Sequence, residues 1–236
     1  MTKPRRILIT GAGRGLGLEF TKRWLADGRE VCALARDPEG SPGLASLKAD
    51  YGESLHLVRC DVGDEASVQA ARGEVTAFVE GLDLIVNNAG TYGPRGETLG
   101  SVSFDEIRRV FEVNTLAPIR VAKAFVPLLM QGEAPRIVQM TSLMGSIADN
   151  GSGGSWSYRL SKAALNMMTK NLSHELAQSA IPCICIHPGW VRTDMGGPKA
   201  PLSIGESVAA LIDTIDALSM EHSGAFLDRD GKPLPW

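Results

Sequence analysis

The sequence lacks the features of a disulfide-bonded, metal-binding or membrane-spanning protein. It contains 4 cysteines and 4 histidines in 236 residues, and only 6% of its residues are aromatic. The cysteines show no framework spacing and the histidines are scattered. We therefore interpret the cysteines as small buried residues of strands and expect no metal site. Apolar runs such as residues 7–9 and 84–86 are far shorter than the ~20 residues that a membrane span needs.

The sequence also lacks an excess of charge of one sign. Lys and Arg number 24, Asp and Glu number 27, and the formal net charge is -3. This balance gives no electrostatic attraction to nucleic acid or to an anionic membrane, so we expect neither partner. The basic N-terminal residues are not followed by the apolar stretch of a secretory signal. We therefore expect the chain to stay in the cytoplasm.

Short apolar runs alternate with amphipathic stretches along the whole chain. With 44% hydrophobic residues and no repeat or long linker, residues 1–236 are interpreted as a single domain. Strands are expected near residues 5–10, 30–35, 55–60, 83–87, 135–141, 182–187 and 224–227, with helices between them. This alternation predicts a Rossmann-type, doubly wound α/β fold, in which helices cover both faces of a mostly parallel sheet of about seven strands.

The first expected strand runs into a glycine-rich turn and then into a helix at residues 15–27. The turn contains Gly11, Gly13, Arg14, Gly15, Leu16 and Gly17. Glycines let a backbone approach a pyrophosphate closely, and the amide groups at the start of a helix attract its negative charge. The spacing is GxxxGxG rather than GxGxxG, so the turn alone is weak evidence. Its position between a strand and a helix nevertheless predicts a dinucleotide site.

The end of the second expected strand indicates which dinucleotide binds. In NAD-binding Rossmann domains this strand ends in an acidic residue that accepts hydrogen bonds from the ribose hydroxyls. Here it ends in Ala35 and Arg36, and Arg36 is suited to pair with a 2'-phosphate, with Arg14 as a second cation. We therefore predict NADP(H) rather than NAD(H). The alternative is that both arginines are solvated surface residues and that Asp37 neutralises Arg36.

Tyr158 and Lys162 are spaced so that a phenol and an ammonium group lie on one face of an expected helix. A tyrosine ionises near pH ~10, and a neighbouring positive charge lowers this pKa toward neutrality, where the phenol can give or take a proton. The same spacing also occurs by chance in amphipathic surface helices. The other motifs of the chain favour the catalytic interpretation.

Further motifs follow in order along the chain: Asp61-Val62, Asn87-Asn88-Ala89-Gly90, Asn114, Ser142, the segment from Tyr158 to Lys162, and Pro188-Gly189-Trp190-Val191-Arg192-Thr193. Together with the glycine turn, they resemble the short-chain dehydrogenase/reductase superfamily over essentially the whole chain. The resemblance is greatest to its C-factor and carbonyl-reductase-like branch. Each motif is unspecific alone, whereas their joint occurrence is highly specific.

The resemblance implies three more cofactor-binding segments, which contain Asp61, Val62, Asn88, Ala89, Gly90, Pro188, Gly189, Val191 and Thr193. The first segment would flank the adenine, the second would shape the cofactor cleft, and Thr193 in the third would contact the nicotinamide carboxamide. Taken by themselves, the second and third segments have simpler explanations as a turn and as the end of a strand. Asp61 alone would be a loop residue or the cap of a helix that begins near Asp64.

The resemblance also implies a catalytic set of Asn114, Ser142, Tyr158 and Lys162. Tyr158 would act as the general acid, protonating a carbonyl oxygen as hydride leaves the nicotinamide, and Ser142 would hydrogen-bond the same oxygen. Lys162 would lower the pKa of Tyr158 and bind the cofactor ribose. Asn114 would position a water that links Lys162 to solvent. Without the resemblance, Ser142 is a hydroxyl at a strand end and Asn114 a polar residue in a helix.

The chain departs from the family pattern between Ser142 and Tyr158. Sixteen positions separate the two residues, about three more than is usual, and a loop absorbs such an excess at little cost because closure entropy rises slowly with length. The excess falls in residues 149–154, and Thr141 stands where many members have serine. We expect catalysis to survive and the shape of the loop near the substrate to differ.

The sequence thus predicts an NADP(H)-dependent oxidoreductase that reduces a carbonyl, in a ketone, aldehyde or quinone, to an alcohol. The alternatives are a cofactor-binding regulatory or signalling protein with little turnover and an NAD-dependent alcohol dehydrogenase. The substrate is not specified, because it would be selected by loops at residues 91–103, 143–157 and 194–204. Six side chains in or near these loops either line an apolar pocket or pack together: Thr91, Tyr92, Met144, Trp156, Trp190 and Met195.

Two expected helices, at residues 104–131 and 156–179, carry apolar residues on more faces than one sheet contact needs. The first contains Phe104, Ile107, Val110, Phe111, Val121, Ala124, Phe125 and Leu128, and the second Ala163, Ala164, Leu165, Met167, Met168 and Leu172. Extensive exposed apolar patches usually mark interfaces. We therefore expect a homodimer or homotetramer through these helices, as the resemblance also implies. The alternative is that the extra apolar surface packs beneath loops of one subunit.

Overall fold

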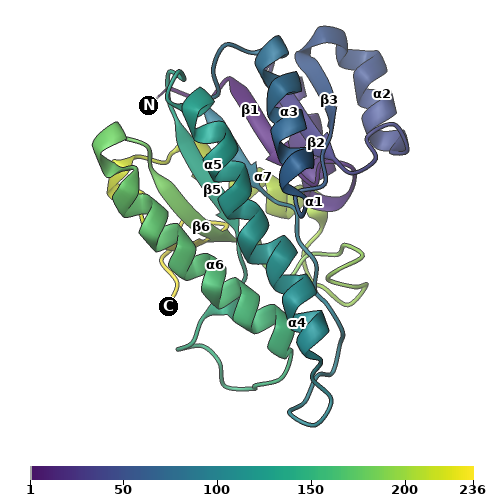
Figure 1. Cartoon of the computed structure of the whole chain (residues 1–236), viewed down its shortest axis with the longest axis vertical. Helices are drawn as coiled ribbons and strands as arrows, with labels where there is room; N and C mark the ends of the chain where they lie inside the picture. The colour runs from purple at the N-terminus through teal and green to yellow at the C-terminus, as the bar shows by residue number, and fades with distance from the viewer. Residues whose placement is uncertain (1) are drawn as a thin grey trace.

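Seven strands form one parallel sheet in the order β3-β2-β1-β4-β5-β6-β7 (Figure 1). The computed structural model describes residues 2–236. The strands are β1 (Arg6–Thr10), β2 (Glu30–Ala35), β3 (Leu55–Arg59), β4 (Leu84–Asn87), β5 (Arg136–Met140), β6 (Cys183–His187) and β7 (Phe226–Asp228). The four residues of β4 and the five of β5 are all buried, as expected for central strands that are covered on both faces. The predicted doubly wound α/β fold is confirmed.

Helices cover both faces of this sheet. They are α1 (Gly15–Ala26), α2 (Pro42–Tyr51), α3 (Glu65–Phe78), α4 (Phe104–Phe111), α5 (Ala117–Leu129), α6 (Trp156–Glu175) and α7 (Ile204–Asp216). Because side chains alternate along a strand, Ile7 and Ile9 pack with Phe20 of α1 in one core, whereas Leu8 packs with Phe125 of α5 in the other. Figure 1 shows α3, α5 and α6 on the near face of the sheet.

The helix expected at residues 104–131 is interrupted. A π-helical turn, η2 (Glu112–Leu116), separates α4 from α5, and Pro118 lies in the first turn of α5. A π turn inserts an extra residue into a helix and is often found at functional sites. Here it contains Asn114, which is fully buried. The second expected helix, at residues 156–179, ends as α6 at Glu175 and is followed by a short 3-10 turn.

All four cysteines are buried free thiols, as expected for small core residues. Three of them lie within strands, but Cys60 lies one residue beyond β3. Its backbone N–H still bonds to the Ala35 carbonyl, so it continues the strand pairing by one step. Within residues 2–236, no helix is both long enough and apolar enough to cross a membrane.

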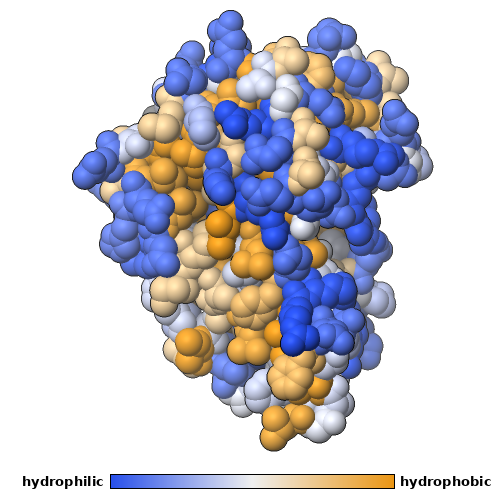
Figure 2. Space-filling view, viewed as in Figure 1, coloured by the Kyte–Doolittle hydropathy of each residue, from blue (hydrophilic) through white to orange (hydrophobic). Residues whose placement is uncertain are grey.

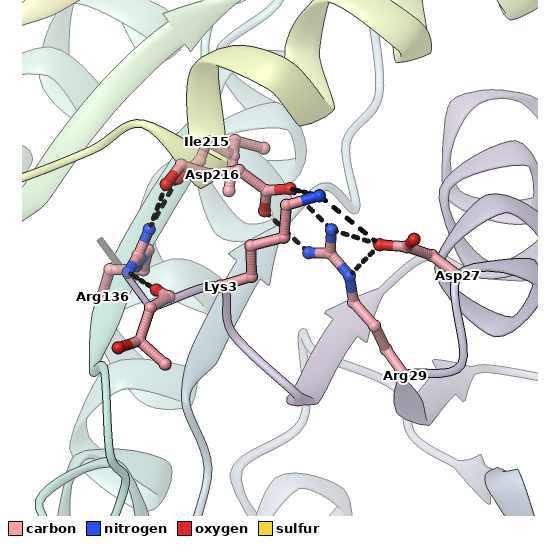
Figure 3. Close-up of polar contacts among 7 residues, drawn as sticks. Lys3, Asp27, Arg29, Arg136, Ile215 and Asp216 are labelled. Atoms are coloured by element: carbon pink, nitrogen blue, oxygen red, sulfur yellow. Dashed lines mark hydrogen bonds and ion pairs between the residues drawn. The ribbon is translucent and has the colours of Figure 1, made fainter.

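An ionic cluster closes the edge of the sheet where the strands begin (Figure 3). Arg29 is 4% exposed and bonds to Asp27 at 2.8 Å and to Asp216 at 2.6 Å. Arg136 donates to the carbonyls of Ile215 and Asp216 and so satisfies the end of α7, where helix carbonyls lack partners. These contacts fix α7 against β2 and β5, and they leave the opposite edge of the sheet as the place for a site.

Candidate active site

The predicted site residues gather at the carboxyl edge of the sheet, where doubly wound folds bind their ligands. The glycine turn follows β1, Arg36 follows β2 and Asp61 follows β3. Asn88 to Gly90 follow β4, Ser142 follows β5, and Pro188 to Thr193 follow β6. Tyr158 and Lys162 lie in the first half of α6, and Asn114 lies in the turn between α4 and α5. Segments that are far apart in the sequence therefore meet at one edge.

The glycine turn is sterically closed against the loop after β4. A Cβ on Gly11 would lie 2.9 Å from the Cα of Ala89, and Gly11 has a φ of +67°. A Cβ on Gly17 would lie 2.2 Å from the Gly11 carbonyl oxygen. Gly13 has no such contact, since its nearest neighbour would be 3.7 Å away. Close packing therefore explains Gly11 and Gly17, whereas a Cβ on Gly13 would make only ordinary van der Waals contacts with Ala35 and Ser41.

Hydrogen bonds hold the turn in shape. The Thr10 hydroxyl accepts from the backbone N–H groups of Asn88 and Ala89, and the Asn88 side chain donates to the Thr10 carbonyl at 2.9 Å. On the other side, the Ser41 hydroxyl donates to the Gly13 carbonyl at 2.7 Å. Leu16 packs partly buried against the core behind the turn. The turn is thus fixed from β4 and α2 before any ligand is present.

The two arginines predicted for the 2'-phosphate have different surroundings. Arg36 is exposed at the end of β2. Asp37 forms its ion pair with Arg59, at 3.5 Å, and not with Arg36. Arg14 pairs with Asp194, which belongs to the loop after β6, and both side chains are more than three-quarters exposed. In this arrangement Arg36 stands at the expected position, whereas Arg14 bridges two loops.

Asp61 and Val62 form the loop after β3. The Asp61 carboxylate accepts from the backbone N–H of Gly63 at 3.0 Å, and Asp64 is the residue that caps α3, through the N–H of Ala66. The interpretation of Asp61 as a helix cap is therefore wrong. Val62 is 8% exposed and packs in the core, so only its backbone and one edge reach the surface.

The segment after β6 faces the glycine turn. Gly189 has a φ of +84°, and a Cβ there would lie 2.4 Å from Leu202, so a side chain at this position is excluded. Val191, two residues after Gly189, is buried. It forms a parallel bridge with Leu202 at the far end of the same loop. The Thr193 methyl group would lie 3.8 Å from a Cβ on Gly15. The loops after β1 and β6 therefore approach each other across the edge of the sheet.

Tyr158 lies in the first turn of α6 with its side chain turned inward. It is 7% exposed, and its ring stacks on that of Tyr92, with centroids 4.5 Å apart. Burial raises the pKa of Tyr158 to about 12, and a hydrogen bond with Ser142 opposes this rise. The Ser142 hydroxyl also accepts from the backbone N–H of Met144 at 3.2 Å. At neutral pH the phenol is therefore protonated and able to donate.

Lys162 lies one helical turn further along α6. Its ammonium group is 5.8 Å from the centre of the Tyr158 ring and donates to the Met140 carbonyl at 2.7 Å. Burial lowers the pKa of Lys162 to about 8. The expectation that Lys162 lowers the pKa of Tyr158 is not met in this structure. Burial disfavours the charged form of both groups, and so it raises the pKa of the phenol and lowers that of the ammonium group.

Asn114 clamps two segments together. Its amide N–H groups donate to the Thr91 carbonyl at 2.8 Å and to the Ser161 hydroxyl at 3.0 Å, and its amide oxygen accepts from the Thr91 N–H. One lone pair of that oxygen is left. A Cβ on Gly90 would lie 3.3 Å from this oxygen and 3.9 Å from the Lys162 nitrogen. The missing side chain of Gly90 thus leaves space between Asn114 and Lys162.

The lengthened segment between Ser142 and Tyr158 is absorbed in an exposed loop. Residues 147–154 are all exposed, and Gly153 and Gly154 both have positive φ. Arg159 on α6 donates to the Gly153 carbonyl and to the Ser152 hydroxyl, and so holds the loop near the helix. The extra residues therefore enlarge the exposed loop beside the site and leave Ser142 and Tyr158 facing each other.

Sequence reasoning missed Glu97 and named Tyr92 only as a side chain that lines an apolar pocket or packs with its neighbours. Glu97 is 5% exposed and bonds to Ser157, and the Tyr92 hydroxyl bonds to Ser155 at 2.9 Å. Nothing in the local sequence indicates these contacts, because each joins positions some 60 residues apart in the chain.

The fold and this site define a dinucleotide-binding α/β protein with a buried Tyr-Ser-Lys cluster. The family model for short chain dehydrogenases matches residues 5–201. The chain therefore belongs to the short-chain dehydrogenase/reductase superfamily, and its similarities lie in the C-signal and carbonyl-reductase-like branch that the sequence predicted.

Three similar proteins illustrate this relationship. "C-signal" of Myxococcus xanthus is 44% identical over 155 residues, which are 66% of this chain and 93% of that protein. The structure of the carbonyl reductase Sniffer of D. melanogaster is 34% identical, with a TM-score of 0.93, and 98% of this chain and 99% of that chain are covered. NADPH-bound carbonyl reductase from chicken fatty liver is 36% identical, with a TM-score of 0.92, and both chains are covered completely.

Proposed function

We propose that this chain is an NADP(H)-dependent oxidoreductase that reduces a carbonyl to an alcohol, with Tyr158 as the general acid. The observation that carries the proposal is the placement of the Tyr158 phenol, which is buried, stacks on Tyr92 and lies with Ser142 at the carboxyl edge of the sheet. A proton donor and a second hydroxyl at one point suit a carbonyl oxygen that accepts both. The similar carbonyl reductases agree with this chemistry.

Each of these residues would have its own role in the reduction of the carbonyl. Ser142 holds the carbonyl oxygen by a hydrogen bond and so polarises the C=O bond. Tyr158 gives its proton to that oxygen as the carbon is reduced. When bound, the nicotinamide of NADPH supplies the hydride. Lys162 binds the ribose hydroxyls, and its positive charge then stabilises the phenolate that Tyr158 leaves behind.

The glycine turn and Arg36 fit the two ends of NADP(H). The turn is closed against Ala89 and leads directly into α1, so its backbone amides at the start of that helix would lie beside a pyrophosphate. Arg36 is exposed where NAD-binding proteins carry an acidic residue, and its guanidinium would pair with the 2'-phosphate. The similar chicken enzyme was crystallised with NADPH.

The substrate class follows from the side chains around the phenol. Tyr92 stacks on Tyr158, and its hydroxyl lies 3.8 Å from the Met144 sulfur. Arg95 lies over the Tyr92 ring and donates to the Met195 carbonyl at 2.6 Å, which draws the loop after β6 toward the site. An apolar, partly aromatic wall next to one polar oxygen site favours apolar ketones, aldehydes or quinones.

A screen of carbonyl compounds with NADPH tests the proposal. Ketones, aldehydes and quinones are offered at equal concentration, and oxidation of NADPH is followed by its absorbance. We expect turnover with at least one apolar carbonyl compound. If the chain binds NADPH yet oxidises it with none of these classes, the proposed activity is wrong.

A second candidate function is regulatory or signalling binding of the cofactor with little turnover. It is favoured by the 44% identity with C-signal. The four members of the predicted catalytic set, Asn114, Ser142, Tyr158 and Lys162, are all present and meet at one edge, which favours an enzyme instead. Tight NADPH binding without turnover in the screen would decide for the regulatory function.

We also infer that the chain self-associates and works in the cytoplasm. Apolar side chains remain on the face formed by α5 and α6 (Figure 2). Leu160 and Met167 on α6 are 43% and 64% exposed, and Ile119 on α5 is 43% exposed. Val121, Phe125 and Leu128, which were expected to contribute, are instead buried in the core. The four free, buried thiols fit a reducing compartment such as the cytoplasm.

A further inference from the structure

The helix that carries Tyr158 begins without a cap of its own. Ser155 stands at the N-cap position of α6, but it has a φ of 47° and its side chain makes no capping hydrogen bond. The first N–H groups of a helix have no partner inside the helix and need an acceptor from elsewhere. Ser157 and Tyr158 lie within this first turn and are both buried, so water does not replace the missing acceptor.

Glu97 supplies that acceptor from the loop between β4 and α4. One carboxylate oxygen accepts from the backbone N–H of Ser157 at 2.9 Å, and the other accepts from the Ser157 hydroxyl at 2.5 Å. Glu97 is 5% exposed and Ser157 is fully buried. A negative charge at the start of a helix is favourable, and hydrogen bonds to a carboxylate are stronger than neutral ones.

The residue next to Ser157 is Tyr158, so the position of the phenol depends on this contact. From the same loop, the Tyr92 hydroxyl bonds to Ser155 and the Tyr92 ring stacks on Tyr158. The loop therefore holds the first turn of α6 on two sides. A buried carboxylate is costly unless its hydrogen bonds are good, and both bonds of Glu97 go to the residue that precedes Tyr158.

We propose that Glu97 is a positioning residue for Tyr158, which fixes the first turn of α6 so that the phenol faces Ser142. The proposal rests on the proposed function for its effect on turnover. It does not require Glu97 to touch the substrate or the cofactor. Lys162 lies one turn deeper in α6 and has its own bond to Met140, so cofactor binding should depend little on Glu97.

The chain offers a matched control at the start of α7. There the Glu206 carboxylate accepts from the Ser203 N–H at 2.9 Å and from the Ser203 hydroxyl at 2.5 Å. The donor groups and distances match those of Glu97, although Glu206 is exposed and one of its oxygens accepts both bonds, and α7 carries none of the predicted catalytic residues. Glu206→Ala thus removes a glutamate that bonds at a helix start elsewhere in the chain and leaves Tyr158 undisturbed.

The experiment compares Glu97→Ala, Glu97→Gln and Glu206→Ala for kcat, KM and NADPH affinity. A small displacement of a catalytic group costs up to about 100-fold in rate, so we expect kcat of Glu97→Ala to fall by about 10- to 100-fold. The Kd for NADPH should stay unchanged. Gln keeps an oxygen for the Ser157 N–H and should restore most of kcat, and Glu206→Ala should keep it. An unchanged kcat in Glu97→Ala would overturn the proposal.

A second readout separates this proposal from the proposed function. The chain has 3 tyrosines, so comparison with Tyr158→Phe isolates the ionisation of Tyr158 in an absorbance titration. The groups that face the phenol are Tyr92, Ser142 and Lys162, with Arg95 over Tyr92. Loss of the cap admits water, so the phenol should ionise at lower pH in Glu97→Ala and at the original pH in Glu206→Ala.

The titration decides the matter even if no carbonyl compound is turned over. A lowered pKa of Tyr158 in Glu97→Ala then supports positioning by Glu97 while the proposed activity fails. An unchanged pKa overturns the positioning role. If Glu97→Ala does not fold, Glu97→Asp takes its place, because it keeps the charge but is one methylene too short to reach both Ser157 groups. Wild-type kcat and Tyr158 pKa in Glu97→Asp would overturn the proposal.

Discussion

The ring of Tyr92 stacks on the ring of Tyr158, with centroids 4.5 Å apart and an angle of 27° between the planes. This contact excludes water from one face of the phenol and contributes to the burial that raises its pKa. The Tyr92 hydroxyl is at the same time fixed by Ser155. The phenol is therefore held as a neutral donor by an aromatic neighbour from another loop, whereas the Lys162 ammonium group turns to the Met140 carbonyl.

Tyr158→Phe should lose turnover and keep cofactor affinity. The substitution removes only the hydroxyl, and general acid catalysis contributes about 100- to 10,000-fold to a rate, so kcat should fall by at least about 100-fold. NADPH titration should give the wild-type Kd, since the ring still stacks on Tyr92. Tyr51→Phe, far from the site in α2, is the control. Near-normal turnover in Tyr158→Phe would remove Tyr158 from the mechanism.

Arg36 should determine the choice between NADPH and NADH. In the double variant Ala35→Asp, Arg36→Leu, the guanidinium that would pair with the 2'-phosphate is lost and a carboxylate replaces it. A hydrogen bond to a charged group contributes about 1.5 to 3 kcal/mol, so NADPH binding should weaken by about 10- to 100-fold or more while NADH is relatively favoured. Arg72→Leu, on exposed α3 surface, should change neither Kd. If the wild-type chain binds NADH more tightly than NADPH, Arg36 does not select the cofactor through a 2'-phosphate.

Lys162→Met should stabilise the protein at pH 7 while it abolishes turnover. Burial lowers the pKa of Lys162 from 10.5 in the unfolded chain to about 8 in the folded one. The unfolded state therefore binds more protons between these pH values, and wild-type stability rises with pH in that window. Below pH 8 the folded protein carries the full cost of the buried charge, about 3 kcal/mol at about 1.4 kcal/mol for each pH unit.

Urea unfolding at several pH values checks this prediction. The stability advantage of Lys162→Met should be largest at pH 7 and should shrink as the pH rises from 8 toward 10.5, because the wild-type ammonium group then loses its proton. Lys170→Met, an exposed position on the same helix, should show no such trend. If the variant is less stable than the wild type at pH 7, the contacts of the Lys162 ammonium group stabilise the fold by more than the burial of its charge destabilises it.

Met167→Glu should dissociate the predicted dimer. Met167 is 64% exposed on α6, and a charge in the middle of an apolar interface is not compensated there. Sedimentation at micromolar concentration should give a wild-type species of at least twice the 25.2 kDa chain mass and a variant at the chain mass. Met220→Glu, exposed on another part of the surface, should remain associated. A wild-type chain that sediments at 25.2 kDa would exclude the dimer.

Much of the fold follows from patterns that are local in the sequence. The seven expected strands lie within two residues of those observed, because a buried parallel strand needs a short, continuous apolar run wherever it occurs. The glycine turn is local only in part, since Gly17 closes on the Gly11 carbonyl within the turn whereas Gly11 closes on Ala89 of the loop after β4. The order of motifs was sufficient to predict the superfamily, which the family comparison confirms.

The tertiary structure alone decided how the site is held and charged. The bonds of Asn114 to Thr91 and Ser161 join segments that are far apart in the chain. The cap that Glu97 provides for Ser157 and the stacking of Tyr92 on Tyr158 do the same. The sequence predicted that Lys162 lowers the pKa of Tyr158, whereas burial raises that pKa to about 12. Sequence spacing determined which groups meet, but their protonation depends on how much solvent the assembled fold leaves around them, and burial is a property of the whole packed molecule.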